Sequence, residues 1–129
     1  MSIERVHKND LGNRIRELRK GKIPKLSQRE MASRLGITNA SMSDIENGNL
    51  FPSEELLLKI VELLSTPQKT RESIFKLFSK AKGVPPPDIS QFIKREPSIH
   101  PLLRKMSYKK ITQENIAEIE KAVEKFESL

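Results

Sequence analysis

Residues 27–49 read SQREMASRLGITNASMSDIENGN, and this stretch carries the signals of two short helices joined by a tight turn. Ser27 and Glu30 have the spacing of a capping box, in which the Ser hydroxyl accepts a hydrogen bond from the third helical amide and the Glu side chain reaches back. Gly36 readily adopts a left-handed conformation, so it ends the first helix. Thr38 then caps a second helix, which we expect over residues 38–47.

The chain before this stretch predicts one more helix. Residues 1–9 are polar and show no pattern, whereas Leu11, Ile15 and Leu18 recur at spacings of four and three, which indicates an amphipathic helix that ends near Lys20. A basic loop over residues 21–25 follows, and its glycine and proline do not continue a helix.

The chain after this stretch predicts two further helices. Ser53 caps a strongly apolar segment over residues 54–64, which we expect at the centre of the core. Thr66 and Pro67 have the residue types of a cap and a first helical position, and they predict a fifth helix that ends near Gly83. The first 83 residues therefore read as a bundle of five helices.

Composition agrees with helices and narrows the classes of function. Only 5% of the 129 residues are aromatic and none is Trp, so the core must be built mainly from aliphatic side chains, and we expect an all-α fold. The absence of Cys excludes disulfides, thiolate metal sites and cysteine nucleophiles. His7 and His100 lie far apart and have no regular carboxylate spacing around them, so we expect no metal, no cofactor and no enzyme. No signal-peptide pattern or long apolar span is visible, and we expect a cytoplasmic protein.

Positive charge is concentrated at one end of the chain. The net charge is +7, from 24 Lys and Arg against 17 Asp and Glu. Residues 5–25 hold eight basic side chains, Arg5 and Lys8 among them, and only two acidic ones. The total alone is explained equally well by solubility, but this distribution favours a polyanionic partner.

The quoted stretch resembles the helix-turn-helix of the xenobiotic-response-element family, which includes Cro and phage repressors. The resemblance rests on Gln28 at the start of the first helix, Ala32 on its inner face, Gly36 in the turn and Ile-Glu-Asn-Gly over residues 45–48. With the flanking helices it covers about residues 10–80. It implies a five-helix, phage-repressor-like domain over residues 1–83, followed by a helical C-terminal extension over residues 84–129.

The resemblance also implies which side chains contact DNA. The helix over residues 38–47 would lie in the major groove, and its base-contacting candidates are Thr38, Asn39, Ala40, Ser43 and Asp44. Asn39 is the first choice because its amide can donate to and accept from adenine, while Ala40 suits a thymine methyl and Asp44 a cytosine amine. The alternative for each is an ordinary solvated side chain.

Other polar and basic residues are candidate phosphate contacts. These are Gln28, Arg29, Ser41, Asn47, Arg14, Lys20, Lys22 and Lys25. Ser41 has the alternative of a hydroxyl bonded within its own helix, and Asn47 that of a C-capping side chain. Arg19 and Glu46 are expected to form a structural ion pair instead, although the interval between Arg19 and Gln28 is about two residues longer than the family's usual one.

The last 46 residues match no motif. Val-Pro-Pro-Pro over residues 84–87 reads as a stiff extended spacer and marks the domain boundary. A short helix before Pro97, a second one capped by Ser98 and a last one capped by Thr112 follow. The last helix carries a stripe that is a possible dimer seam or, alternatively, packs on the chain's own core. The stripe consists of Ile116, Ile119, Val123 and Phe126.

The resemblance implies a homodimeric repressor that binds double-stranded DNA, with the dimer formed either through this C-terminal region or through the fourth and fifth helices. Two alternatives remain: the antitoxin of a toxin-antitoxin pair, whose C-terminal helices bind a protein partner, and an interaction module that has kept the fold and lost DNA binding. The basic flank and the polar face of the helix over residues 38–47 favour DNA binding, because protein contact requires neither.

Overall fold

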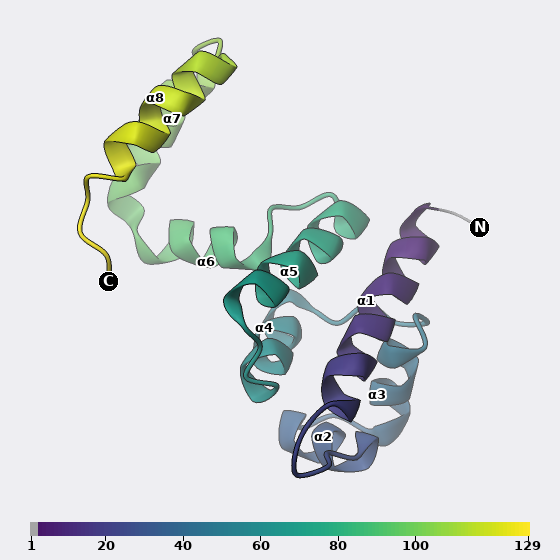
Figure 1. Ribbon diagram of the computed structural model, residues 1–129. Helices are drawn as coiled ribbons and strands as arrows, with labels where there is room; N and C mark the ends of the chain where they lie inside the picture. The colour runs from purple at the N-terminus through teal and green to yellow at the C-terminus, as the bar shows by residue number, and fades with distance from the viewer. Residues whose placement is uncertain (1–2) are drawn as a thin grey trace. The chain divides into compact units, whose positions relative to one another are not determined.

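The computed structural model describes the backbone of residues 3–129 and the side chains of residues 10–129, so the predicted contributions of Arg5, Lys8 and His7 lie outside the described side chains. Within this range the protein is all-α, with eight α-helices and no strand (Figure 1). The helices are α1 (Ile3–Lys20), α2 (Gln28–Leu35), α3 (Asn39–Glu46), α4 (Glu54–Leu63), α5 (Gln68–Lys82), α6 (Pro87–Arg95), α7 (His100–Ser107) and α8 (Gln113–Val123). A 3₁₀ turn (Pro97–Ile99) precedes α7. The predicted fold class is confirmed.

Hydroxyl caps fix the starts of α2, α3 and α4. The hydroxyl oxygens of Ser27 and Thr38 accept from the third helical amide at 3.0 Å, and that of Ser53 does so at 3.1 Å. Gly36 has φ 73° and ends α2 in the left-handed conformation that the turn requires. The predicted return contact of Glu30 is not made, because its carboxylate accepts from Arg34 Nη2 at 2.7 Å, one turn further along α2.

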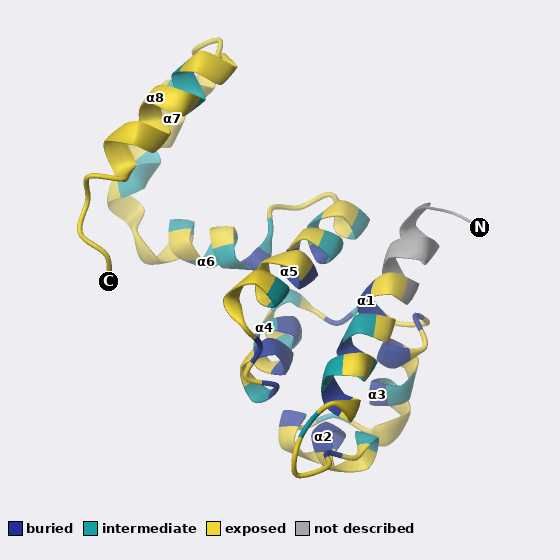
Figure 2. Cartoon of the chain, in the orientation of Figure 1, coloured by how far each residue is buried: buried dark blue, intermediate teal, exposed yellow. Residues whose placement is uncertain are grey.

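The N-terminal unit, up to Gln91, has a continuous core (Figure 2). Helix α1 packs on α5 and α3, and α2 packs on α3 and α4. The buried apolar residues are Leu11, Ile15, Leu26, Met31, Ala32, Leu35, Met42, Ile45, Leu57, Ile60, Val61, Leu64, Ile74, Phe75 and Phe78. Side chains from α1 to α5 thus close one core, and the α2–α3 pair is held on it as a rigid unit.

Gly12 allows α1 to cross α3 in direct backbone contact. A Cβ atom at this position would lie 2.3 Å from the carbonyl oxygen of Ile45 and 2.6 Å from that of Glu46. Since real Cβ atoms do not approach backbone oxygen so closely, any larger residue would push the end of α3 away from α1. The family resemblance placed Ala32 on the inner face of α2, but no sequence signal selected Gly12.

Four element boundaries differ from the sequence predictions. Helix α1 begins at Ile3, and no Gly or Pro occurs from residue 3 to residue 9 to prevent this extension. Thr66 does not cap α5, because it is buried and its hydroxyl donates to the Val61 carbonyl at 3.0 Å, which leaves Pro67 at the cap position. Pro87 is the first residue of α6, where a missing amide costs nothing, instead of the last residue of a spacer. Ser98 lies inside the 3₁₀ turn and caps no helix.

The C-terminal unit, Phe92–Leu129, contains no buried residue (Figure 2). Thr112 caps α8 as predicted, with the full reciprocal capping box that Asn115 completes. Phe126 lies beyond the end of α8, so only the first three residues of the predicted stripe belong to this helix. Across the described residues, no helix combines the length and apolar character that crossing a membrane requires.

Candidate nucleic-acid interface

Helix α3 has one buried and one exposed face. Met42 and Ile45 are almost completely buried, whereas Asn39, Ala40 and Asp44 are exposed and Ser43 is half-buried. These four residues come in pairs four apart, 39 with 43 and 40 with 44, so they share one side of the helix. The result is a polar surface on a helix whose opposite side is anchored in the core.

Two of the predicted contact residues build the start of α3. The Thr38 hydroxyl accepts from the Ser41 amide and donates to the Ser41 hydroxyl at 2.9 Å. Both hydroxyls therefore have partners within their own helix. The Ser41 hydroxyl is half-buried and keeps acceptor capacity, since a hydroxyl oxygen has two lone pairs.

Arg19 and Glu46 form a buried, bidentate ion pair between α1 and the end of α3. Arg19 Nε donates to Glu46 Oε2 at 2.7 Å, and Nη2 donates to Oε1 at 2.9 Å. The Glu46 side chain is 0% exposed. A third guanidinium nitrogen of Arg19 donates to the Leu26 carbonyl at 3.1 Å, so the same side chain also holds the loop that leads into α2. The interval between Arg19 and Gln28, although longer than usual in the family, therefore still allows Arg19 to pair with Glu46.

Two more side chains complete the network around Glu46. Gln28 Nε2 donates to Glu46 Oε1 at 3.3 Å, and Arg16 Nε donates to the same oxygen at 3.4 Å. Arg16 also donates to Asn47 Oδ1, while Asn47 Nδ2 donates to the Ser43 hydroxyl at 3.2 Å. The amides of Gln28 and Asn47 are therefore oriented by the protein itself. Arg16 is absent from the sequence predictions, although its spacing of three from Arg19 places both on one face of α1.

The network determines the charge state of Glu46. Burial alone raises the pKa of this carboxyl, but the hydrogen bonds and positive charge of Arg19, with further bonds from Gln28 and Arg16, outweigh burial and hold the pKa below its usual 4.5. The hydrogen bond with Glu46 is also the main reason that the pKa of Arg19 is raised. The pair is therefore ionised at neutral pH.

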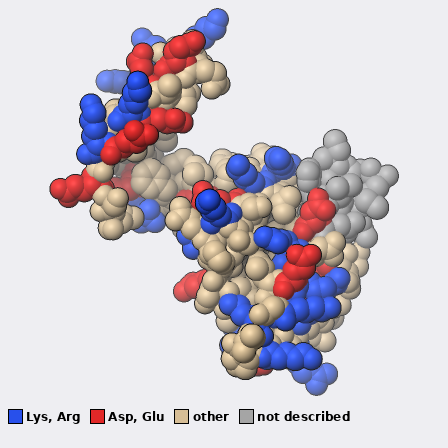
Figure 3. Space-filling model, viewed as in Figure 1, with Lys and Arg blue, Asp and Glu red and all other residues tan. Residues whose placement is uncertain are grey.

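Basic residues surround the entry to α2. A groove of about 610 Å³ there is lined by Arg19, Lys20, Lys22, Lys25, Leu26, Ser27 and Gln28. Figure 3 shows Lys and Arg gathered over the lower end of the N-terminal unit. Arg29 is exposed on α2, whereas Arg14 is half-exposed and pairs with Glu17 at 3.4 Å. The cations, the start of α2 and the polar face of α3 thus belong to one compact unit that can present them to a polyanion.

Among the described residues, His, Asp and Glu side chains form no group of three that could hold a metal ion.

Comparison with known proteins identifies the region that holds this arrangement. Residues 10–74 match the family described as a helix-turn-helix domain. This range, just over half of the chain, contains α2, α3, the Arg19–Glu46 pair and the lysines of the groove. No curated protein and no solved structure matches the chain.

Proposed function

The chain belongs to the helix-turn-helix domain family, and on that premise we propose that it is a sequence-specific regulator of transcription that binds double-stranded DNA as a dimeric repressor of the Cro and phage-repressor type. In this proposal α3 enters the major groove, whose width admits an α-helix. The single observation that carries the proposal is the exposed polar face of α3 on a helix that the buried Arg19–Glu46 pair holds to α1.

The side chains on this face match the groups that base edges offer. The exposed Asn39 amide can pair with adenine through two hydrogen bonds, and the Ala40 methyl can contact the thymine methyl. Asp44 can accept from the cytosine amine. Ser43, held by Asn47, offers its hydroxyl with less rotational freedom, since one acceptor site is already in use.

Phosphate contacts are assigned to the residues around the groove and the helix starts. Lys20, Lys22 and Lys25 supply charge without a protein partner within the described residues, and the start of α2 supplies backbone amides. Gln28 and Asn47 would contact phosphates in the orientation that Glu46 and Arg16 impose on them. Arg14, Arg29 and Ser41 remain candidates at the edge of this surface.

Repression and dimerisation follow from how such domains reach specificity. One short helix reads only a few base pairs, so two copies on a palindromic site multiply the discrimination, and a bound dimer blocks access to a promoter. The exposed apolar stripe of α8 is the proposed surface for the second copy.

Selection of binding sites from a random duplex library, with purified full-length protein at stated salt near physiological ionic strength, tests the proposal. We expect an enriched palindrome whose half-sites lie about one or two helical turns apart. A folded protein that enriches no sequence would contradict DNA recognition by this chain alone and favour an interaction module.

The Asn39→Ala variant tests the role of α3. Removal of the amide should weaken binding to the selected site by about 1 to 3 kcal/mol and leave thermal unfolding unchanged, because Asn39 is exposed. Gln68→Ala, which removes an exposed amide from the start of α5, outside both α3 and the α8 stripe, is the control and should bind as wild type does. Equal affinity of the Asn39→Ala variant for the selected site would remove Asn39 from the base contacts.

A further inference from the structure

The C-terminal unit has helices without a core. Its 38 residues include α7 and α8, yet none of them is buried. Helices of 8 and 11 residues are too short to be stable in water by themselves, and a unit of this size cannot close its own hydrophobic core. Stable helices here require another surface against which their apolar residues pack.

Both helices of the unit carry an apolar stripe. In α7 and the turn before it, Ile99, Leu102 and Met106 recur at spacings of three and four, with Leu103 beside them. In α8 the corresponding residues are Ile116, Ile119 and Val123, followed by Phe126. Ile119 is 41% exposed, Val123 52% and Phe126 70%, so the stripe on α8 lies largely in solvent. In the first stripe Leu102 and Leu103 are exposed, whereas Ile99 and Met106 are half-buried, as is Ile116 in the second. Each stripe thus leaves apolar side chains in contact with solvent.

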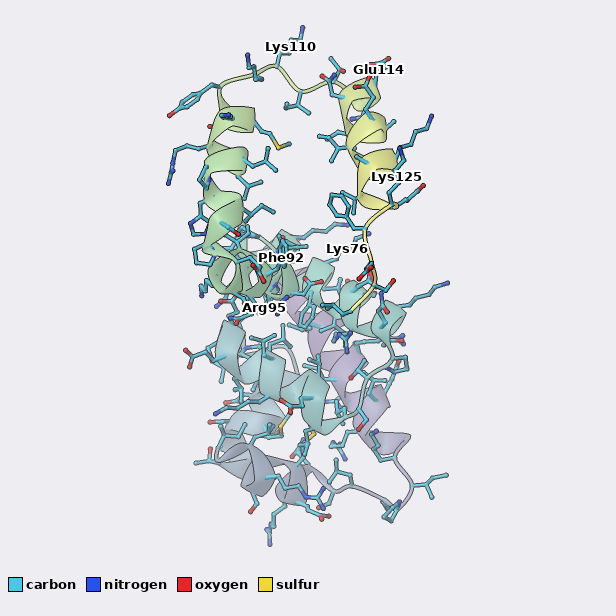
Figure 4. All side chains as sticks on the ribbon, turned by 90° about the vertical axis from the view of Figure 1, so that its left-hand side faces the viewer. Lys76, Phe92, Arg95, Lys110, Glu114 and Lys125 are labelled. Carbon is cyan, nitrogen blue, oxygen red and sulfur yellow. The ribbon has the colours of Figure 1, made fainter. Side chains whose placement is uncertain are left out.

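The two stripes are flanked by opposite charges. Residues 92–111 hold six basic side chains against one acidic side chain, whereas residues 112–129 hold five glutamates against two lysines. Figure 4 shows the segment that joins the two helices, with Lys110 in the basic stretch before it ends and Glu114 at the start of the acidic α8. Within the described residues, Arg104 and Lys105 of α7 form no ion pair with Glu118 or Glu120 of α8. We call α7, α8 and the segment that joins them the C-terminal hairpin. The opposite charges of its two helices are therefore available to a partner.

We propose that α7 and α8 are the homodimer interface, in which the basic α7 of each copy packs its apolar stripe on the acidic α8 of the other copy. A two-fold interface requires a surface that is complementary to itself, because each contact occurs twice with the roles of the copies exchanged. One hairpin that carries both a basic and an acidic apolar helix meets this requirement. A second copy supplies both an acidic helix for the basic α7 and a basic helix for the acidic α8, so charge complementarity favours a second copy of the chain as the partner.

The inference extends the proposed function by assigning its dimer interface to four helices, two from each copy, instead of to the α8 stripe alone. It rests on the proposed function only in assuming that the dimer binds DNA. The interface itself is argued from the charges and the burial of α7 and α8, which do not depend on DNA binding.

Two charge-reversed variants of the full chain test the interface. The first carries Arg104→Glu and Lys105→Glu in α7, and the second carries Glu118→Lys and Glu120→Lys in α8. Each variant alone places like charges on both facing helices of a homodimer, so its dimerisation should be at least about tenfold weaker than that of wild type in sedimentation or native mass spectrometry. All four residues are exposed, so circular dichroism and thermal unfolding of the N-terminal core should remain those of wild type.

Mixing the two variants separates contacts between copies from contacts within one chain. In a mixed dimer, the reversed α7 of one chain faces the reversed α8 of the other, and the two native helices face each other. We therefore expect a one-to-one heterodimer at about wild-type affinity. If the charges acted within a single hairpin, each chain would keep its own repulsion and mixing would restore nothing, which would overturn the proposal.

The wild-type chain separates this interface from the proposed function. A monomeric wild type at micromolar concentration, with or without the selected DNA, would overturn the interface and indicate that the hairpin packs on its own N-terminal unit or on a different protein. A monomer that still enriches a half-site would leave DNA recognition intact. A dimer that enriches no DNA sequence would instead overturn the proposed function and leave the interface standing.

Discussion

The two units of this chain have the same kind of local structure and very different packing. Helices in both begin at hydroxyl caps, Ser27 and Thr38 in the N-terminal unit and Thr112 in the C-terminal unit, and the cap of α8 is the most complete of the three. The N-terminal unit adds fifteen buried apolar residues in one cluster, whereas residues from Phe92 onward add none. Caps therefore specify where a helix begins, but burial determines whether it is stable in isolation.

The difference matches the two roles proposed above. A recognition surface must keep its side chains in fixed positions, and burial of the inner face of α3 and of Glu46 gives α3 this property. In the proposed interface α7 and α8 gain their core from a second copy, so their folding would be coupled to assembly and their stability would depend on protein concentration.

A matched pair of phenylalanine truncations should give the largest effect. Phe75→Ala removes a ring that is 1% exposed in the core of the N-terminal unit and should lower the free energy of unfolding by about 4 kcal/mol. Phe126→Ala removes a phenyl ring from an exposed position and should change the free energy of unfolding by less than about 0.5 kcal/mol at concentrations where the chain is monomeric. Chemical denaturation monitored by circular dichroism measures both.

Protein concentration sharpens this comparison. Where dimers form, Phe126→Ala should destabilise the chain because its ring then loses a partner, whereas the effect of Phe75→Ala should not depend on concentration. A large loss for Phe126→Ala in the dilute monomer would show that the C-terminal unit has a core of its own.

A matched pair of glutamate truncations should give the next largest effect. Glu46→Ala leaves the Arg19 guanidinium buried without its partner and should cost about 3 kcal/mol of unfolding free energy. Glu118→Ala removes an exposed carboxylate from α8 and should leave the monomer within about 0.5 kcal/mol of wild type. The same denaturation experiment applies, and a small effect of Glu46→Ala would mean that water solvates Arg19 once the pair is opened.

The fold of the N-terminal unit was largely predictable because its signals are local. Caps at Ser27, Thr38 and Ser53 and the glycine at Gly36 each act within one helical turn, so residue order alone reveals them. The errors arose where two local signals compete. Thr66 has the residue type of a cap for α5, yet it is buried and its hydroxyl donates to the Val61 carbonyl, five residues earlier in α4.

The candidate site was predictable in part, and for a different reason. The pairing of Arg19 with Glu46 followed from the family resemblance, since 27 positions separate the two residues and no local rule relates them. Arg16 and Gly12 were missed because their roles exist only where α1 meets the end of α3. The C-terminal unit has no family resemblance to guide a prediction, and its apolar stripes do not by themselves give the geometry of any contact.

The smallest expected effect is a pH dependence that belongs to the N-terminal unit alone. The pKa of Glu46 is lower in the folded protein than its usual 4.5, so the unfolded chain takes up a proton first as the pH falls. The contribution of Glu46 to stability is therefore fully present above about pH 6 and is lost progressively below about pH 4.5, as the pH falls toward the pKa of the folded state.

Wild type and Glu46→Gln should differ in unfolding free energy by a constant amount near neutral pH, and this difference should shrink in acid because the variant has no carboxyl to titrate at this position. Glu118→Gln, which changes an exposed carboxyl, is the control and should follow the wild-type curve at concentrations where the chain is monomeric. A difference between wild type and Glu46→Gln that stays constant down to about pH 3 would mean that Glu46 titrates alike in both states and that the Arg19 pair does not hold its charge.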